Sequence, residues 1–311
     1  MKSDLDQLME ARGLDGIVAL VAEVYSPPVD YLSNGARITN GMGIQKRGAA
    51  PLLVANPMEV EEAAKSGLEV ITFSDLGYYE LLETLDDREQ ATIQMWGRAL
   101  ARAGLEQGTI GLFGTADVHY VLALVRGIER AFPHIHFFSE MGITRLALFT
   151  EAAATKDDAE LLRLRSVAAR TDEVLQATWD YLAGHKLDGE RVVDAEGRAL
   201  TIGEVKRFVR RALLDRDLED TDMIFAQGRD AGFPHSRGEE DAGLVAGAPI
   251  VFDLFPREFG GGYFHDTTRT WALGYARPEV EEIYAQVMDA FDVAVEAYRP
   301  GMPTKDMQLA V

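Results

Sequence analysis

Two aspartates in the second half of the chain are placed where they could act together on a proton or a metal ion. Two apolar stretches, residues 248–255 and 262–271, flank a short segment with three consecutive glycines, which predicts an antiparallel hairpin. Asp253 and Asp266 lie at equal distances from the middle of this segment. If the turn closes symmetrically, the two carboxylates stand directly opposite each other on one face, with Cβ atoms roughly 4.5–5.5 Å apart.

Carboxylates this close repel each other, and they lose water among apolar neighbours such as Val251, Phe255 and Phe264. The pair must therefore share a proton or bind a cation. A divalent metal ion is the natural partner, because oxygen ligands suit Mn²⁺, Mg²⁺, Co²⁺ and Zn²⁺. Two alternatives stay open: one aspartate faces solvent or pairs with Arg269, or a bulge in the turn changes the register.

His235 is the histidine that is best placed to join such a site. It lies in a polar turn, Gly232–Arg237, where it could donate a proton or contact a substrate; an ordinary exposed loop histidine is the alternative. Strand alternation turns His265 away from the face of Asp266. The sequence has no Gly-x-Gly-x-x-Gly or Walker loop that opens a helix and no Gly-x-Ser-x-Gly elbow. Dinucleotide, P-loop and serine-hydrolase chemistry therefore have little support.

Two patterns of elements predict two domains. Over residues 1–150, apolar runs of strand length alternate with helical stretches, which predicts an α/β domain. Over residues 151–311, long helical stretches precede and follow the β-like runs, which predicts an α+β domain. The segment 26–35 contains two prolines and is expected to be a loop. Thr155 is a candidate N-cap for the long helix that ends near residue 183.

The composition limits the classes of partner. The chain has 311 residues, enough for two domains, and its 51 acidic and 31 basic residues give a net charge of −20 at pH 7. Such a charge repels nucleic acids and anionic membranes and is compatible with metal ions. The absence of cysteine excludes disulfides and zinc–thiolate sites. Because the acidic N-terminal residues do not resemble a signal peptide, we expect a cytoplasmic protein.

Several motifs together resemble the creatinase, prolidase and Xaa-Pro aminopeptidase family of pita-bread metallohydrolases. The most specific are Val251–Pro256 (Val-Phe-Asp-Leu-Phe-Pro) and Tyr263–Thr270 (Tyr-Phe-His-Asp-Thr-Thr-Arg-Thr), which follow Phe233–Ser236 (Phe-Pro-His-Ser). Residues 155–165 are similar to the family's lead-in to its catalytic domain, and the first 150 residues are similar to its N-terminal domain. The resemblance implies an α/β creatinase-like N-terminal domain followed by an α+β pita-bread catalytic domain.

The resemblance also implies a site with two divalent metal ions, usually Mn, Co or Zn, held by five protein ligands. Asp253 and Asp266 match the first two ligands, and Asp266 is expected to bridge both ions. His235 matches the histidine that contacts the substrate, and Thr268 would orient the metal-binding carboxylates. The implied reaction is attack of a metal-bridged hydroxide on the Xaa-Pro bond of a small peptide with proline at its second position. Family members are commonly homodimers.

The last part of the chain departs from the family pattern. The remaining ligands would be a histidine and two glutamates, but no histidine follows His265, and Glu279, Glu281 and Glu282 lie on or near a predicted helix. Three of the five ligands are therefore lacking, and the pita-bread domain is expected to be incomplete where the chain stops at Val311. We expect either part of a longer Xaa-Pro aminopeptidase or dipeptidase, or a homologue that binds peptides or partners without catalysis. A creatinase-like amidinohydrolase is a third alternative.

Overall fold

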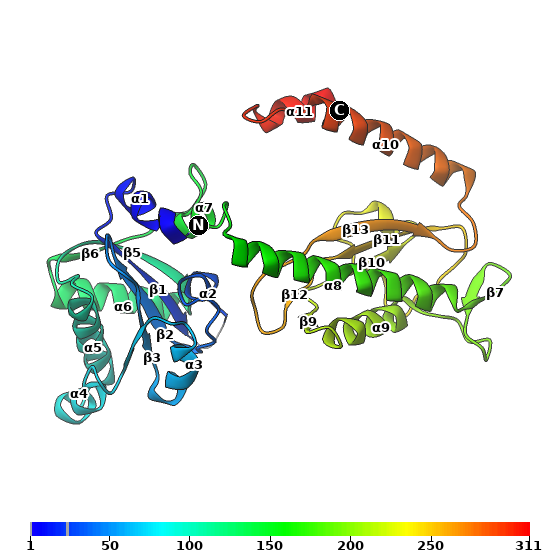
Figure 1. Cartoon of the computed structure of the whole chain (residues 1–311). Coiled ribbons are helices and arrows are strands. Elements are labelled where there is room, and N and C mark those ends of the chain that lie inside the picture. The colour runs from blue at the N-terminus through cyan, green and yellow to red at the C-terminus, as the bar shows by residue number, and fades with distance from the viewer. Residues whose placement is uncertain (1, 23–24) are drawn as a thin grey trace. The chain divides into compact units, whose positions relative to one another are not determined.

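The computed structural model describes residues 2–22 and 25–311 of the chain. Its contacts divide the chain into two compact units (Figure 1). The first comprises Met1–Leu162 with Gly260–Gly262, and the second comprises Arg163–Phe259 with Tyr263–Val311. The chain passes from one unit to the other within helix α8 (Asp158–Ala183). The domain boundary at residue 150 stays a prediction.

The first unit is built on a six-stranded mixed sheet with the strand order β4-β3-β2-β1-β5-β6. The strands are β1 (Gly16–Ala22), β2 (Asn40–Lys46), β3 (Leu52–Ala55), β4 (Glu69–Thr72), β5 (Gly108–Thr115) and β6 (Ile135–Phe138). Strand β1 runs parallel to β5 and β3 runs parallel to β4, while β2 is antiparallel to both of its neighbours. The carboxyl ends of β1, β3 and β4 therefore lie at the same edge of the sheet as the start of β2.

Helices cover both faces of this sheet. They are α1 (Leu5–Glu10), α2 (Pro27–Leu32), α3 (Val60–Ala64), α4 (Tyr78–Leu85), α5 (Arg88–Arg102), α6 (Val118–Ala131) and α7 (Leu148–Ala152), with short 3₁₀ turns η1 (Lys2–Asp4) and η2 (Pro57–Glu59). Successive residues of β1 belong to different apolar clusters. Val18 packs in the cluster that contains Trp96 of α5, and Ile17 packs in the cluster that contains Met9 of α1. Alternation along a strand explains this division, because neighbouring side chains point to opposite faces.

Two local structures in the first unit differ from what the sequence suggested. The segment expected to be a loop forms helix α2, in which Pro27 and Pro28 occupy the first two helical positions. Proline is tolerated there because those positions have no intrahelical hydrogen bond to lose. Strand β2 was not predicted. Its Gly41 lies so close to β3 that an added Cβ would come within 2.2 Å of the Val54 carbonyl oxygen.

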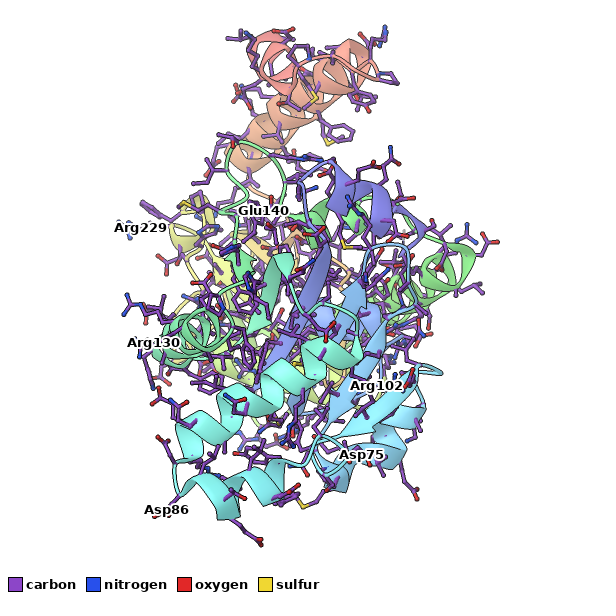
Figure 2. The ribbon with its side chains drawn as sticks, turned by 90° about the vertical axis from the view of Figure 1, so that its left-hand side faces the viewer. Asp75, Asp86, Arg102, Arg130, Glu140 and Arg229 are labelled. Atoms are coloured by element: carbon purple, nitrogen blue, oxygen red, sulfur yellow. The ribbon has the colours of Figure 1, made fainter. Side chains whose placement is uncertain are left out.

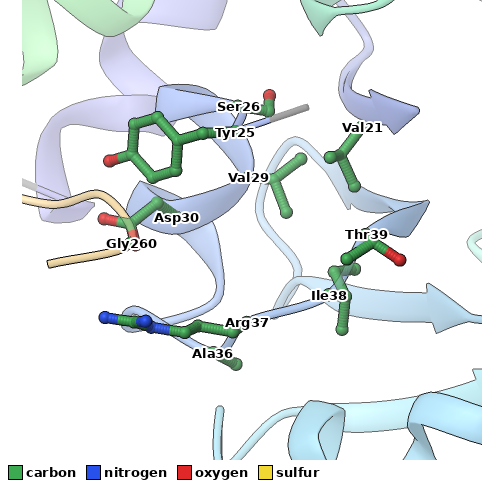
Figure 3. Close-up of a pocket in the computed structure, with 10 residues that line it drawn as sticks. All are labelled: Val21, Tyr25, Ser26, Val29, Asp30, Ala36, Arg37, Ile38, Thr39 and Gly260. Carbon is green, nitrogen blue, oxygen red and sulfur yellow. The ribbon is translucent and has the colours of Figure 1, made fainter. Parts of the chain in front are cut away.

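Helix α2 also helps to enclose a cavity of about 210 Å³ within the first unit (Figure 3). Val29 and Asp30 of the helix line this cavity together with Tyr25, Arg37 and Gly260. Asp30 and Arg37 both take part in contacts within the protein. The segment with the two prolines thus forms part of the wall of this cavity.

The second unit consists mainly of a three-stranded antiparallel sheet, two helices packed on it and two further helices. The strands are β7 (Lys186–Asp188), β8 (Arg191–Val193), β9 (Leu218–Glu219), β10 (Ile224–Gln227), β11 (Pro249–Leu254), β12 (Arg257–Glu258) and β13 (Thr267–Ala272). The central sheet has the order β10-β11-β13. The helices are α8, α9 (Ile202–Leu214), α10 (Pro278–Ala297) and α11 (Thr304–Ala310), with the 3₁₀ turn η3 (Asp230–Gly232). Within the described chain, α10 and α11 contain no buried residue.

One face of the central sheet packs against helices, so only residues on its other face can form a site. Phe252 and Phe225 are buried in one cluster with Val205 and Val209 of α9 and Val174 of α8, and these two helices lie along the sheet in Figure 1. Burial alternates along β11, so every second residue points away from the helices. The α+β arrangement predicted for this half is confirmed.

The start of α8 is capped by a different residue from the one predicted. Asp157 Oδ1 accepts the Glu160 N–H at 2.9 Å, and Glu160 Oε2 accepts the Asp157 N–H at 2.7 Å. This reciprocal pair is a capping box, which satisfies backbone donors at the helix end. Thr155 instead donates its hydroxyl to Asp4 Oδ2 at 3.1 Å. Among the residues that the structure describes, no helix has the length and apolarity needed to cross a membrane.

Candidate functional site

A pocket of about 250 Å³ opens on the face of the central sheet that α8 and α9 leave uncovered. Strands β10, β11 and β13 line it together with the turn η3 and the residues that follow this turn. Its polar lining includes His235, Asp253 and Thr268. The structure therefore brings together three of the four site residues that the sequence indicated, from segments that are far apart along the chain.

Asp253 occupies the middle strand of this sheet. It pairs with Ile224 of β10 on one side and with Thr268 of β13 on the other. Its neighbours Phe252 and Leu254 are fully buried, so the half-buried Asp253 side chain points to the pocket face. Thr268 donates its hydroxyl to Asp253 Oδ1 at 2.5 Å. This hydrogen bond fixes the carboxylate, as expected for a residue that orients a metal-binding group.

The predicted direct opposition of Asp253 and Asp266 is wrong. The residue opposite Asp253 is Thr268, and the next pair along the hairpin joins Leu254 to Thr267. Extending this register by one place puts Phe255 opposite Asp266. Asp266 is exposed and stands diagonally from Asp253, a relationship that places side chains roughly 7–8 Å apart. The two carboxylates share a face but are not a directly facing pair.

The turn of the hairpin explains this shift. The Glu258 N–H donates to the Tyr263 carbonyl oxygen at 3.0 Å, so four residues form the tip of the hairpin. The centre of this tip lies one residue later than the midpoint between Asp253 and Asp266. Gly260, Gly261 and Gly262 in this tip have φ values of 78°, 109° and 125°. Glycine adopts such angles without the steric cost that other residues incur.

An ion pair holds the base of the turn. The Arg163 guanidinium contacts both Glu258 oxygens, with Nη2 2.6 Å from Oε2. The same guanidinium lies 4.8 Å from the centre of the Tyr263 ring. The Tyr263 N–H donates to Glu258 Oε2 at 2.8 Å. Helix α8 therefore fixes the register of the hairpin that carries both aspartates.

His235 is exposed and follows the turn η3 with a φ of 68°, a left-handed conformation that is uncommon for residues other than glycine. Next to it, Arg237 Nε donates to both oxygens of Asp222, at 2.7 and 2.9 Å. This hydrogen bonding from Arg237 lowers the pKa of the Asp222 carboxyl. The ion pair anchors the segment that places His235 over the pocket.

Asp230 is a further acidic residue of this pocket that the sequence analysis did not single out. Its side chain lies 3.7 Å from the Arg229 guanidinium. The available signal was its position just before the polar turn that carries His235, five residues earlier than the histidine. Acidic residues are common in turns, so this signal alone does not distinguish a pocket residue.

The chemistry of the donors suits a divalent ion, although the described residues do not enclose one. Asp253 and Asp266 provide the hard oxygen ligands that Mn²⁺, Co²⁺ and Zn²⁺ accept. Over residues 2–22 and 25–311, however, no group of three or more histidine, cysteine, aspartate or glutamate side chains is close enough to hold a metal ion. The two aspartates are therefore candidate ligands of an incomplete set.

The second part of the chain is similar in sequence to a known family. Residues 163–311 match the sequence model of metallopeptidase family M24. An uncharacterized peptidase of Staphylococcus aureus is 28% identical over 155 residues, which make up 49% of this chain and 39% of that protein. The match therefore spans well under half of the curated relative.

Solved structures show that the fold is shared over almost the whole chain. The Xaa-Pro dipeptidase of Bacillus anthracis has a TM-score of 0.70 at 18% identity, covering 99% of this chain and 75% of that one. The N-terminal domain of FACT complex subunit SPT16 from chickpea has a TM-score of 0.62 at 13% identity, covering 99% and 74%. These likenesses confirm the creatinase-like domain followed by the pita-bread fold. In sequence, residues 163–311 of the chain are similar to metallopeptidase family M24.

Proposed function

We propose that the protein hydrolyses peptide bonds that precede proline, with divalent metal ions bound at Asp253 and Asp266. The observation that supports this most directly is the single pocket in which His235, Asp253 and Thr268 meet. An acidic ligand, a residue that orients it and a group able to move a proton are the parts that metal-assisted hydrolysis requires. The substrate class rests on the resemblance of the hairpin motifs and on the likeness to an Xaa-Pro dipeptidase.

Each residue has a separate role in this proposal. Asp253 and Asp266 hold the metal ions, which when bound supply Lewis-acid activation of the peptide carbonyl and of water. Thr268 keeps the Asp253 carboxylate in one orientation through its 2.5 Å hydrogen bond. His235, exposed at the pocket, donates a hydrogen bond to the carbonyl oxygen of the substrate and stabilises its developing charge. Small peptides with proline at the second position and a homodimeric assembly belong to the same proposal.

The test combines metal binding with turnover by a protein that carries all five family ligands, of which these 311 residues supply Asp253 and Asp266. Mn²⁺ binding is measured by isothermal titration calorimetry for the wild type, for Asp253→Asn with Asp266→Asn, and for Asp241→Asn as an exposed control. The same proteins are incubated with Ala-Pro, Ala-Pro-Ala and Ala-Ala in the presence of Mn²⁺. We expect saturable Mn²⁺ binding and cleavage of the proline peptides, both lost in the double variant and kept in the control.

One observation favours a second candidate function, a homologue that binds peptides without hydrolysing them. Within the described residues, no cluster of three or more metal ligands is assembled. A fold can also serve several functions. Proline peptides that bind without being cleaved, with Mn²⁺ binding no tighter than in the double variant, would favour this second candidate. Turnover of creatine in place of the peptides would assign the chain to an amidinohydrolase.

A further inference from the structure

The first unit contains a cavity that the proposed function does not use. Its volume is about 350 Å³. It lies at the edge of the six-stranded sheet where β1, β3 and β4 end and β2 begins, lined there by Leu20, Asn56, Phe73 and Asn40. Open α/β sheets commonly bind ligands at the carboxyl ends of their strands. The lining residues all belong to the first unit.

Aromatic side chains form much of the wall of this cavity. They are Phe73, Tyr78, Tyr79, Trp96 and Tyr120. The Phe73 and Tyr79 rings pack edge-on against Tyr78, with centroids 6.1 and 5.9 Å away. Trp96 is only 1% exposed, whereas Tyr79 is 50% exposed. The cavity therefore has a buried aromatic interior and a more open aromatic rim, which suits a flat ring.

Over residues 2–22 and 25–311, the polar lining has one charged side chain, Arg88 at the start of α5. Arg88 is exposed, and no acidic group of the described residues lies within 4.0 Å of its guanidinium. The carboxylate of the adjacent Asp87 accepts the Glu89 and Gln90 N–H groups at 2.9 and 3.1 Å. Arg88 lies in the first turn of α5, where the positive end of the helix dipole also favours an anion. No acidic side chain in the described part of the chain competes for Arg88, which can therefore bind a carboxylate.

We propose that this cavity binds a small planar aromatic carboxylate. The ring would lie among the aromatic walls, and the carboxylate would face the Arg88 guanidinium. The sign of the ligand's charge follows from the lining, because Arg88 is the one charged side chain among the described residues that line the cavity. The size follows from the volume of about 350 Å³, which lies at the lower end of the range of small-molecule sites.

Two probes of the same shape separate the contributions of the ring and the charge. Indole-3-acetate carries the carboxylate, and indole-3-acetamide replaces it with a neutral group. Their binding to the 311-residue chain is measured by calorimetry at low ionic strength. We expect saturable binding of the acetate about tenfold tighter than that of the acetamide, because a hydrogen bond to a charged group is stronger than one to a neutral group.

Three variants test which residues bind the ring and which bind the carboxylate. Arg88→Gln is expected to lower the affinity for the acetate to that for the acetamide. Arg130→Gln should change neither affinity: Arg130 is an exposed cation on α6 (Figure 2), and it is not among the residues that line the cavity. Tyr79→Ala should weaken both probes alike, since it removes an aromatic wall. Circular dichroism verifies that each variant is folded.

Three results would overturn the proposal: no saturable binding of the acetate, equal affinity for the two probes, or binding that Arg88→Gln and Tyr79→Ala leave unchanged. Asp253→Asn should leave the binding of indole-3-acetate unaltered, since Asp253 belongs to the second unit. Failure of peptide hydrolysis is therefore distinguishable from failure of this proposal.

Discussion

Thr268 donates its hydroxyl to Asp253 Oδ1 at 2.5 Å directly across the β11–β13 pair. The same register that makes this contact moves Asp266 to a diagonal position. Thr268 therefore occupies the place that the sequence suggested for the second carboxylate. In the central sheet, the side chain nearest to Asp253 on β13 is a hydrogen-bond donor that can orient it, and the potential second ligand lies beyond it.

Thr268→Val should lower Mn²⁺ affinity and peptide turnover about 10- to 100-fold, the usual effect of removing a residue that orients a metal ligand. Valine has nearly the shape of threonine but cannot donate to Asp253. Thr268→Ser restores the donor and serves as the matched control. Calorimetry and a peptide assay measure both quantities. Unchanged Mn²⁺ affinity in the valine variant would mean that the hydrogen bond has only a structural role.

His235→Asn should reduce turnover by about 10²-fold, the usual cost of removing a donor to a developing oxyanion, and leave Mn²⁺ affinity unaltered. Asparagine tolerates the left-handed backbone that His235 adopts at φ 68°, so the loop should keep its conformation. Steady-state kinetics at several peptide concentrations separate kcat from KM. If both turnover and Mn²⁺ affinity fell together, His235 would instead be part of the metal site.

Arg12→Ala should destabilise the first unit by about 3 kcal/mol, the cost of breaking a buried ion pair. The Arg12 side chain is 3% exposed; its guanidinium lies 3.1 Å from Glu140 and 2.8 Å from Glu151, and donates to the Leu146 carbonyl. Urea unfolding followed by circular dichroism measures the change. Arg130→Ala is the control, because Arg130 is exposed, as Figure 2 shows, and should alter stability by less than about 0.5 kcal/mol.

The anchor of the His235 loop should weaken in acid. Arg237 lowers the pKa of the Asp222 carboxyl in the folded protein, so the ion pair contributes its full stability above the ordinary aspartate range. That contribution is lost as the pH falls through the lowered pKa, because the folded state must then take up the proton. The difference in urea midpoint between the wild type and Asp222→Asn should therefore shrink with decreasing pH. A difference that stays constant would contradict this assignment.

Local sequence patterns predicted most of the elements and the resemblance to a family. Alternating apolar runs predicted the α/β first half, and the motifs around Asp253 and Asp266 identified the hairpin and its relatives. Hydrophobic periodicity can be recognised in a sequence because helices and strands each place apolar residues at a characteristic spacing. The loop predicted for residues 26–35 is wrong over Pro27–Leu32, which form a helix, because proline opposes helix interiors but suits a helix start.

Only the tertiary structure decided which of these residues meet. Three glycines at positive φ placed the hairpin tip one residue later than symmetry suggested, and a one-place change in a turn changes every cross-strand partner. His235 lines the pocket, and the Arg237–Asp222 ion pair lies two residues further along the same loop. The aromatic cavity beside Arg88 combines strand ends and helices from across the first unit. Such sites depend on packing between segments that are distant in the sequence, and local sequence patterns do not indicate which segments pack together.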